Sequence, residues 1–299
     1  MRWTTGAPAK VNLDLRMVGV RDDGYHLLTT VLQSIGLADQ VTLLARPGPF
    51  AITCDTAGVP TDASNLAWKG AMAMAVHLGV TLDGWQLDLD KQVPAQAGLG
   101  GGSADAAAAA RLVAAAAGRV LAAAELADVI RPLGADVAFF AWGGTMLGEG
   151  VGDWLTPLPD VAPAAVLLVR PPFGVSTRDA YRWYDDSDRG PLRGSGPVRG
   201  PDRAPQALHG VCLDQCTNDL EGPVVARHPE IGSVVARLRD SGARLAAMSG
   251  SGSACVGLFD PGADLSRVVD QWPEGTQVWH TVLLDRPAYA ERTACVHRR

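Results

Sequence analysis

Pro94-Ala95-Gln96-Ala97-Gly98-Leu99-Gly100-Gly101-Gly102-Ser103-Ala104 is the stretch of sequence that decides the fold. It follows the alternating run Trp85–Asp90, which predicts a half-buried β-strand. After Asp105 comes the alanine-rich run Ala106–Ala117, which predicts a helix. A strand, a glycine-rich loop and a helix start can bind an anion through the backbone alone, because the first N–H groups of a helix lack intrahelical acceptors. We therefore expect this stretch to bind phosphate groups.

The residues of this loop do not fit two familiar phosphate-binding motifs. A P-loop ends in Gly-Lys followed by Ser or Thr, and the chain contains no Gly-Lys pair. A dinucleotide-binding fingerprint needs a third glycine where Ser103 stands. Four glycines among residues 98–102 let the main chain pass close to a ligand without Cβ atoms. We therefore expect a phosphate-binding loop of a different kind.

Length and composition are those of an ordinary globular protein. The 299 residues suffice for one large domain or two moderate ones, and 47% of them are hydrophobic. The net charge of −6 argues against a nucleic-acid-binding surface, which would show basic clustering. Met1–Ala9 lacks the apolar core of a signal peptide, and arginines interrupt the apolar run Ala106–Ala124. With five scattered cysteines, we expect a cytoplasmic protein with no membrane span.

Residues Ala9–Val18 alternate between polar and apolar side chains, which predicts a β-strand. Lys10 and Asn12 fall on the same face of this strand, two residues apart, so one ligand can contact both. A lysine on a strand face is more often simply solvated. The pair therefore marks a candidate site that needs further support.

A tight turn follows at residues 21–26 and opens into a second predicted strand, Leu27–Leu37. Its Tyr25 and His26 offer an aromatic stacking face and polar edges. From the residues alone, an exposed hairpin is the better interpretation of this pair.

The remaining elements are predicted from periodicity and from turn residues. Strands are expected at 41–45 and 50–54 around a turn, and at Ala164–Val169, Cys255–Phe259 and Gln277–Leu284. Helices are expected at 65–78 with Asp62 or Ser64 as the cap, at 121–133, around Tyr181, from Asn218, and along the stripe Ile231–Leu238. Lys91 looks like an ordinary exposed lysine. The glycine-rich segment 148–152 is expected to mark a domain seam, and 185–206 a mobile surface loop.

Asp136 has two interpretations that the residues alone leave open. It follows Gly134 directly and precedes the apolar run Val137–Phe140. A carboxylate in this place can cap a short buried helix. It can equally be a functional acid or base.

The spacing Pro-x-x-x-Gly-Leu-Gly-Gly-Gly-Ser-Ala at 94–104 resembles, without a break, the nucleotide loop of the GHMP small-molecule kinases. Pro8–Leu13 stands where that family has its first motif, and Met248–Ala254 resembles its third motif. The resemblance covers nearly the whole chain. It implies an α/β (α+β) fold of two domains, with the ligands between them. The expected domains are a ribosomal-S5-like, ATP-binding one at 1–157 and a ferredoxin-like, substrate-side one at 158–299.

The resemblance also implies roles for individual residues. Lys10 and Asp136 are the expected catalytic pair, with Asp136 accepting the proton of the acceptor hydroxyl. The expected ATP-binding residues are Asn65 and Lys91 near the adenine, and Pro94, Ala95, Gln96, Ala97, Gly98, Leu99, Gly100, Gly101, Gly102, Ser103 and Ala104 along the phosphates. The expected substrate-binding residues are Asn12, Tyr25, His26, Thr177 and Tyr181. The expected third-motif loop facing the phosphates consists of Ser249, Gly250, Ser251 and Gly252.

The acceptor is suggested by Pro8–Leu13 together with Asp23–His26. This combination resembles the family members that phosphorylate the 2-hydroxyl of 4-diphosphocytidyl-2-C-methyl-D-erythritol in non-mevalonate isoprenoid synthesis. It implies that Tyr25 and His26 line one side of the cytosine, with Tyr181 opposite. Mg²⁺ is expected with ATP, and Ser103 is the one ligand that we can nominate.

Several points stay open at this stage. The acceptor could be homoserine or mevalonate, although the Tyr25–His26 turn and the segment 171–181 speak against both. The chain could also be a GHMP-like sensor that binds nucleotide without catalysis, but it has kept both Lys10 and Asp136. We expect a monomer or homodimer with no nucleic-acid or membrane partner.

Overall fold

Two β-sheets organise the protein in a computed structural model that describes residues 1–187, 211–269 and 272–298. Within these ranges the first sheet has seven strands. Its path is β11 (Val296–Arg298), β1 (Arg2–Val20), β2 (His26–Ala45), β4 (Trp85–Asp90) and β3 (Ala51–Cys54), while β5 (Thr145–Glu149) joins β2 to β6 (Trp154–Pro157). The second sheet has the order β10 (Gln277–Val282), β7 (Ala165–Arg170), β9 (Cys255–Phe259) and β8 (Leu245–Met248).

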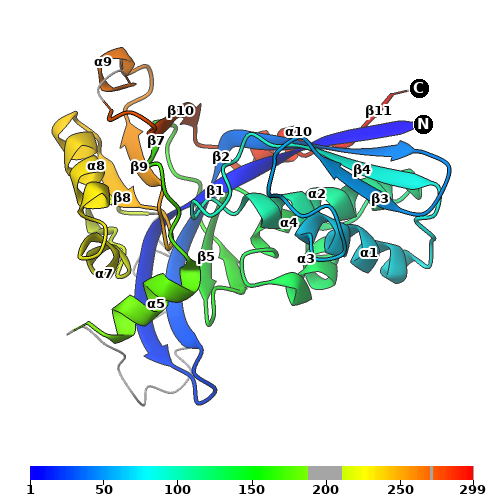
Figure 1. Ribbon diagram of the computed structural model, residues 1–299, viewed down its shortest axis with the longest axis horizontal. Coiled ribbons are helices and arrows are strands. Elements are labelled where there is room, and N and C mark those ends of the chain that lie inside the picture. The colour runs from blue at the N-terminus through cyan, green and yellow to red at the C-terminus, as the bar shows by residue number, and fades with distance from the viewer. Residues whose placement is uncertain (188–210, 270–271, 299) are drawn as a thin grey trace.

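Each sheet has its own set of helices, and Figure 1 shows the two resulting lobes side by side. The helices of the first lobe are α1 (Leu66–Leu78), α2 (Gly101–Ala116), α3 (Ala123–Ile130), the 3₁₀ turn η1 (Arg131–Leu133) and α4 (Phe139–Trp142). Those of the second lobe are α5 (Thr177–Asp185), η3 (Leu213–Gln215), α7 (Glu221–Val225), α8 (Pro229–Asp240) and α9 (Ser266–Val269). The last helix, α10 (Arg286–Arg292), returns to the first sheet and is followed by β11.

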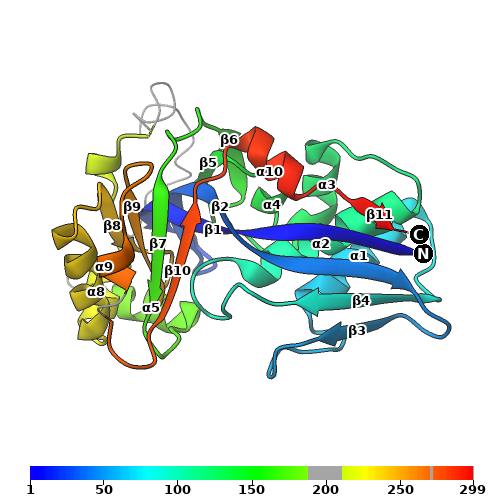
Figure 2. The ribbon, with the colours of Figure 1, turned by 90° about the horizontal axis from the view of Figure 1, so that it is seen from above.

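The long strands β1 and β2 connect the lobes, as Figures 1 and 2 show. They pair antiparallel along almost their whole length, with register shifts at Pro8/Lys10 and Asn12/Asp14. Such bulges bend a strand and increase its twist. The far end of β1 then bonds to the second lobe, where Leu15 N–H donates to Thr217 O at 2.8 Å. The segment with Lys10 and Asn12 therefore lies where one lobe meets the other.

The alanines of α2 allow this helix to be buried on all sides. Residues 106–110 are fully inaccessible between α1 and the first sheet. A Cβ atom on Gly70 of α1 would lie 2.2 Å from Ala106 O, so the two helices pack at backbone distance. Alanine loses no side-chain entropy when it is buried. The alanine-rich run thus gives a thin, rigid helix behind the glycine loop.

Most predicted elements are confirmed, and the corrections have local causes. The helix after the loop begins at Gly101, not near Ala106, because the loop residues themselves take helical conformation. Asn65, not Asp62 or Ser64, caps α1 by accepting the N–H of Ala67. The 121–133 helix is shorter, since α3 ends at Ile130 before the 3₁₀ turn that contains Pro132.

The structure corrects one expected connection and adds details that the sequence did not predict. The glycine-rich segment 148–152 is the β5–β6 hairpin turn inside the first sheet, with positive φ at Gly150 and Gly152. The predicted strands 41–45 and 50–54 are confirmed as the end of β2 and as β3, and β4 lies between them in the sheet. The sequence did not predict α10 and β11.

Two of the predictions lie beyond what the structure tests. The predicted loop at 185–206 falls mostly outside the described residues, and the domain boundary at 157/158 stays a prediction. None of the helices in the described ranges combines the length and the apolar character that crossing a bilayer requires.

Candidate active site

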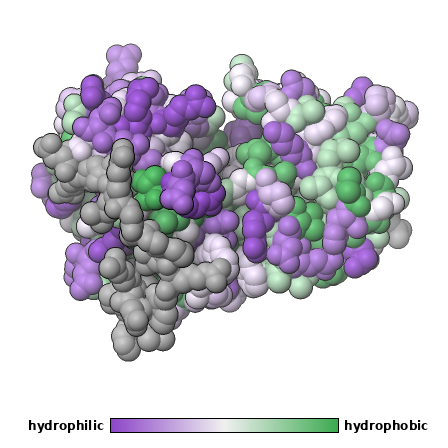
Figure 3. Space-filling view, turned by 90° about the horizontal axis from the view of Figure 1, so that it is seen from below, coloured by the Kyte–Doolittle hydropathy of each residue, from purple (hydrophilic) through white to green (hydrophobic). Residues whose placement is uncertain are grey.

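A cleft of about 960 Å³ is lined by residues of both lobes. Figure 3 shows a notch between the lobes on one face of the molecule. The lining contains most of the predicted site residues, namely Lys10, Asn12, Asn65, Lys91, residues 94–103, Asp136, Thr177, Tyr181, Gly250, Ser251 and Gly252. The predicted residues outside this lining are Tyr25, His26, Ala104 and Ser249.

The glycine-rich loop places the start of α2 in the wall of this cleft. Gly98 and Gly100 have φ values of 75° and 71°, which favour glycine strongly. The carbonyl oxygen of Gly100 accepts the N–H of Ala104 at 2.9 Å. The N–H groups of residues 101–103 therefore have no acceptor within the helix. Together with the positive end of the helix dipole, they form an anion-binding position.

The glycines of the loop also serve packing within the protein. A Cβ atom on Gly98 would lie 2.1 Å from Ser249 O, and one on Gly100 would lie 2.7 Å from the Phe140 ring. By contrast, a Cβ atom on Gly102 would meet only Leu66 Cδ1, at 3.7 Å. The expectation that the glycines only clear space for a ligand is therefore incomplete. At 98 and 100 they let neighbouring protein segments approach.

Backbone hydrogen bonds join the loop to segments of both lobes. Lys10 N–H donates to Leu99 O at 3.0 Å, and Ala254 N–H donates to Ala97 O at 3.2 Å. Ser249 Oγ donates to Gly98 O at 3.1 Å. The first motif, the glycine loop and the third motif are therefore held together as one unit.

Lys10 and Asp136 face each other in the cleft. Lys10 Nζ lies 3.4 Å from Asp136 Oδ2, and the lysine side chain is 4% exposed while that of Asp136 is 43% exposed. Lys10 Nζ also donates to Asn12 Oδ1 at 2.6 Å. Asp136 makes no capping bond to α4, whose N-cap residue is Ala138. The geometry therefore favours a functional carboxylate over the capping interpretation.

A chain of hydrogen bonds fixes the orientation of the Asn12 amide. Its Nδ2 donates to Thr30 Oγ1 at 2.8 Å, and Thr30 Oγ1 donates to Asp14 O at 2.7 Å. The Oδ1 atom is consequently turned toward Lys10. Sequence reasoning missed Thr30, because nothing along the chain shows which residue of the next strand pairs with Asn12.

The third motif lies against the first motif and against α5. A Cβ atom on Gly250 would lie 3.0 Å from Asn12 Oδ1. Thr177 Oγ1 and Ser251 Oγ are hydrogen-bonded at 3.1 Å. Asn218 Nδ2 donates to Met248 O and Gly250 O, both at 2.8 Å. Asn218 thus holds the third motif in place, which its position before a predicted helix did not reveal.

Asn65 and Lys91 are both engaged by the protein itself. The Asn65 side chain accepts the N–H of Ala67 at 2.8 Å and donates to Pro60 O at 2.6 Å. The Lys91 ammonium forms ion pairs with Asp39 and Asp105, and its side chain is only 8% exposed. The interpretation of Lys91 as an exposed lysine is therefore wrong.

The ion pairs of Lys91 strongly affect its buried partner. Burial raises the pKa of Asp105 to about 7, although Lys91 acts in the opposite direction. Burial alone would lower the pKa of Lys91, but the two carboxylates outweigh it and raise that pKa. Asp105 Oδ1 is buried without a hydrogen-bond partner, which fits a carboxyl group that resists ionisation. This cluster adjoins the glycine loop, since a Cβ atom on Gly101 would lie 3.5 Å from Asp39 Oδ2.

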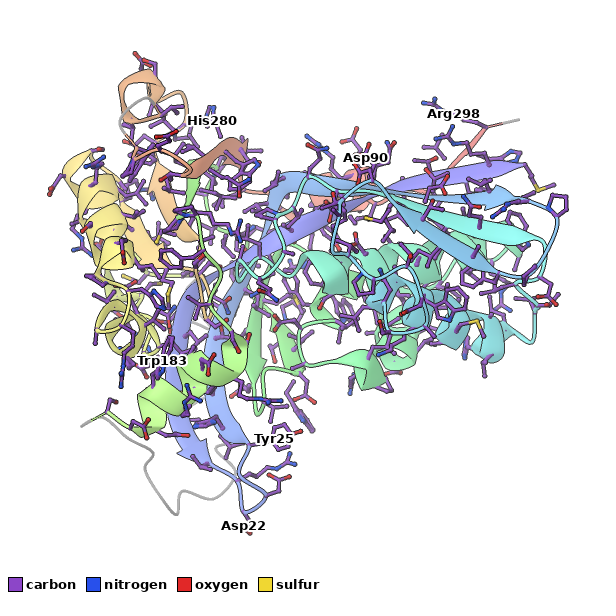
Figure 4. All side chains as sticks on the ribbon, in the orientation of Figure 1. Asp22, Tyr25, Asp90, Trp183, His280 and Arg298 are labelled. Carbon is purple, nitrogen blue, oxygen red and sulfur yellow. The ribbon has the colours of Figure 1, made fainter. Side chains whose placement is uncertain are left out.

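The aromatic residues lie at the outer end of the site. The rings of His26 and Tyr181 have centroids 4.8 Å apart, so a pyrimidine cannot lie between these two rings. The expected slot, with Tyr25 and His26 on one side of the base and Tyr181 opposite, stays a prediction. Tyr25 is 63% exposed, and Figure 4 shows it near the tip of the β1–β2 hairpin. The guanidinium carbon of Arg21 lies over the Tyr25 ring, 5.5 Å from its centroid.

Matches to family models cover parts of both lobes. Residues 65–144 match the GHMP kinases N terminal domain, and residues 207–276 match the GHMP kinases C terminal domain. The mixed α/β, two-domain fold that the sequence predicted is confirmed by these matches and by a solved relative. That relative, the crystal structure of 4-(cytidine 5'-diphospho)-2C-methyl-D-erythritol kinase, is 32% identical with a TM-score of 0.76 over 94% of this chain and 98% of its own.

Curated relatives agree with this result. A 4-diphosphocytidyl-2-C-methyl-D-erythritol kinase of Geobacter metallireducens is 39% identical over 235 residues, which cover 77% of this chain and 80% of the relative. One from Clostridium botulinum is 38% identical over 179 residues, and there the match spans 60% of this chain and 64% of the relative's length. The chain belongs to the GHMP kinase family, among the 4-diphosphocytidyl-2-C-methyl-D-erythritol kinases.

Proposed function

We propose that the protein transfers the γ-phosphoryl group of ATP to the 2-hydroxyl of 4-diphosphocytidyl-2-C-methyl-D-erythritol, a step of non-mevalonate isoprenoid precursor synthesis. The observation that carries the proposal is the Lys10–Asp136 pair, which lies in the same cleft as the N-terminus of α2. The Lys10–Asp136 pair can activate a hydroxyl, and the N-terminus of α2 can hold phosphates. The identity of the acceptor is inferred from the names of the relatives, which are kinases of this compound.

In this proposal the chemistry is mainly positioning and charge stabilisation. The Asp136 carboxylate accepts the proton of the 2-hydroxyl, and the hydroxyl oxygen forms a bond to the γ-phosphorus. The bond from that phosphorus to the β–γ bridging oxygen breaks, and ADP leaves. Lys10, whose Nζ lies 3.4 Å from Asp136 Oδ2, orients that carboxylate and stabilises charge on the reacting oxygens. The N–H groups of residues 101–103 hold the triphosphate.

Mg²⁺ belongs to the proposal as the usual companion of ATP. Among the described residues no group of three or more His, Cys, Asp or Glu side chains could hold a metal ion. Mg²⁺ commonly binds through one or two protein ligands together with substrate phosphates. A single protein ligand and the phosphates of ATP can therefore hold the ion. The Ser103 hydroxyl, in the first turn of α2, is the nominated protein ligand, and the ion would neutralise charge on the phosphates.

The assembly and the compartment are part of the same proposal. All five cysteines are free thiols, which supports a reducing cytoplasm. We propose a monomer or a homodimer.

An ADP-release assay with a panel of acceptors tests the proposal. Turnover should require ATP, Mg²⁺ and 4-diphosphocytidyl-2-C-methyl-D-erythritol, and ³¹P NMR should detect a new phosphomonoester on that acceptor. Homoserine and mevalonate should give no turnover above the rate without acceptor. Preferred turnover of either one would refute the acceptor assignment. Tight ATP binding without turnover of any acceptor would favour a nucleotide sensor instead.

A further inference from the structure

Thr30 lies buried on β2 between two neighbouring strands, and each branch of its side chain has a fixed place. It pairs with Leu15 of β1 on one side and with Gly148 of β5 on the other. A Cβ atom on Gly148 would lie 3.1 Å from Thr30 Cγ2, so the methyl group packs directly against β5. On the β1 side, Thr30 Oγ1 donates to Asp14 O at 2.7 Å. Because β-branched side chains have few χ1 rotamers, this packing fixes the direction of the hydroxyl group.

The hydrogen bond to Asp14 decides what Thr30 can offer to Asn12. A hydroxyl group has one hydrogen and two lone pairs. Since the hydrogen is donated to Asp14 O, only lone pairs remain, and Thr30 Oγ1 accepts from Asn12 Nδ2 at 2.8 Å. The backbone of Asn12 is fixed as well, because its N–H donates to Ser249 Oγ at 3.2 Å. The Asn12 amide therefore has one favourable orientation, with Oδ1 on the side of Lys10.

The position of the Lys10 ammonium depends on this orientation. Lys10 is buried, and its Nζ lies 2.6 Å from Asn12 Oδ1 and 3.4 Å from Asp136 Oδ2. The amide oxygen is thus the nearer of these two partners. An amide turned the other way would place its NH₂ group against the ammonium, which can only donate. Because a buried charge without an acceptor is costly, Lys10 would then leave its place beside Asp136.

We propose that Thr30 is a positioning residue for the phosphoryl transfer, because its hydroxyl group orients the Asn12 amide that holds Lys10 in place. The inference rests on the proposed function, in which Lys10 stabilises charge on the reacting oxygens. Thr30 acts without touching either substrate, since its hydroxyl group is engaged within the protein. A change at this hydroxyl should therefore affect the chemical step more than the binding of ATP.

Two substitutions of Thr30 test the role of its hydroxyl group in turnover. Thr30→Val replaces the hydroxyl by a methyl group, and kcat should fall about 10–100-fold, as expected when a catalytic group is misplaced by about 1 Å. Thr30→Ser keeps the hydroxyl and should keep most of the wild-type kcat. Calorimetric titration with a non-hydrolysable ATP analogue should give the same affinity in both variants, because backbone N–H groups of α2 form the anion site. Wild-type kcat in Thr30→Val, or an equal loss in Thr30→Ser, would overturn the inference.

Thr29→Val is the matched control for these variants. Thr29 lies on the opposite face of β2 and outside the lining of the cleft, so the same substitution there should leave kcat unchanged. Thermal unfolding and binding of the ATP analogue show whether each variant is folded. If Thr30→Val does not fold, Thr30→Ala takes its place, since it removes the same hydroxyl group without adding a methyl group. Its kcat should fall in the same way, and a wild-type value would again overturn the inference.

A double variant separates positioning from a merely structural role. If Thr30 acts through Lys10, Thr30→Val should lower kcat no further once Lys10 has been replaced by alanine. Strictly multiplicative losses would show that Thr30 acts on something other than Lys10, and they would overturn the inference.

Crystal structures of the variants give a readout that does not depend on turnover. In Thr30→Val, Lys10 Nζ should lie outside hydrogen-bonding distance of Asn12 Oδ1, whereas Thr30→Ser should keep this contact. An unmoved Lys10 and Asn12 in Thr30→Val would overturn the inference. If Lys10 moves but the wild type does not phosphorylate the acceptor, the proposed function fails and Thr30 still positions Lys10. If the wild type phosphorylates the acceptor and Thr30→Val does so equally fast, only this inference fails.

Discussion

Replacing Asp136 by asparagine should remove most of the turnover and leave the fold in place. Lys10 Nζ lies 3.4 Å from Asp136 Oδ2. At an effective dielectric constant of about 20, their gross attraction is about 5 kcal/mol. Solvent screens much of this, since the Asp136 side chain is 43% exposed. Asn12 Oδ1 stays as an acceptor for the buried ammonium. We therefore expect the free energy of unfolding to fall by only about 1–2 kcal/mol.

The effect on turnover should be much larger, because an amide cannot accept the hydroxyl proton. We expect kcat to fall by about 10²–10⁴, the range for loss of a general base. ATP affinity should change little, since backbone N–H groups of α2 form the anion site. Steady-state ADP release with 4-diphosphocytidyl-2-C-methyl-D-erythritol measures kcat. Calorimetric titration with a non-hydrolysable ATP analogue measures affinity, and thermal unfolding measures the stability.

Two further variants make this experiment decisive. Asp128→Asn removes a surface carboxylate that pairs with Arg131 at 3.2 Å and is 74% exposed, so its kcat should equal that of the wild type. Lys10→Ala should lower kcat by about 10²–10³. The double variant should lose less than the product of the two effects, because Lys10 acts partly through Asp136. Wild-type kcat in Asp136→Asn, or strictly multiplicative losses, would refute the reasoning.

Three further predictions concern the loop, the buried ion pairs and the exposed tyrosine. Gly98→Ala should destabilise the protein by several kcal/mol, about 3 or more, whereas Gly102→Ala should be nearly neutral in thermal unfolding, because only the former adds a Cβ atom 2.1 Å from a carbonyl oxygen at positive φ. The raised pKa of Asp105, about 7, means that the native state keeps a proton that the unfolded state releases above about 4. Stability should therefore fall as pH rises from about 4 to about 7, by up to about 1.4 kcal/mol per pH unit. Urea unfolding should show a shallower dependence in Asp105→Asn, and an identical dependence would contradict the assignment. Tyr25→Ala should weaken acceptor binding about ten- to a hundredfold with ATP binding unchanged, and equal weakening of both ligands would exclude a stacking role.

The elements that the sequence predicted well are those whose signal is local. The alternation at Trp85–Asp90, the glycines of the loop and the alanines after it each decide a few residues of structure. The strand at Ala9–Val18 was predicted for the same reason, and Lys10 and Asn12 do contact each other. Their shared face was expected to be polar and open. It is instead buried, because the third motif, more than 230 residues further along the chain, covers it.

The features that were missed depend on contacts between distant segments. Thr30 and Asn218 carry no pattern of their own, and each acts only through a partner that the fold delivers. The β11 strand is three residues long and would not be stable alone. It exists because β1 offers it an edge. Short elements of this kind are decided by tertiary structure, which local propensity cannot show.

Lys91 illustrates why a residue's type and position do not reveal its environment. From the sequence it follows an exposed aspartate at a strand end, the usual place for a solvated lysine. In the fold, β2 contributes Asp39 and α2 contributes Asp105, and the ammonium lies between them. The Asp39 carboxylate also accepts the N–H groups of Gln92 and Val93, at 2.6 and 2.7 Å. The same ion pairs therefore fix the segment that leads into the glycine loop, so the loop's position depends on buried charges that no local motif records.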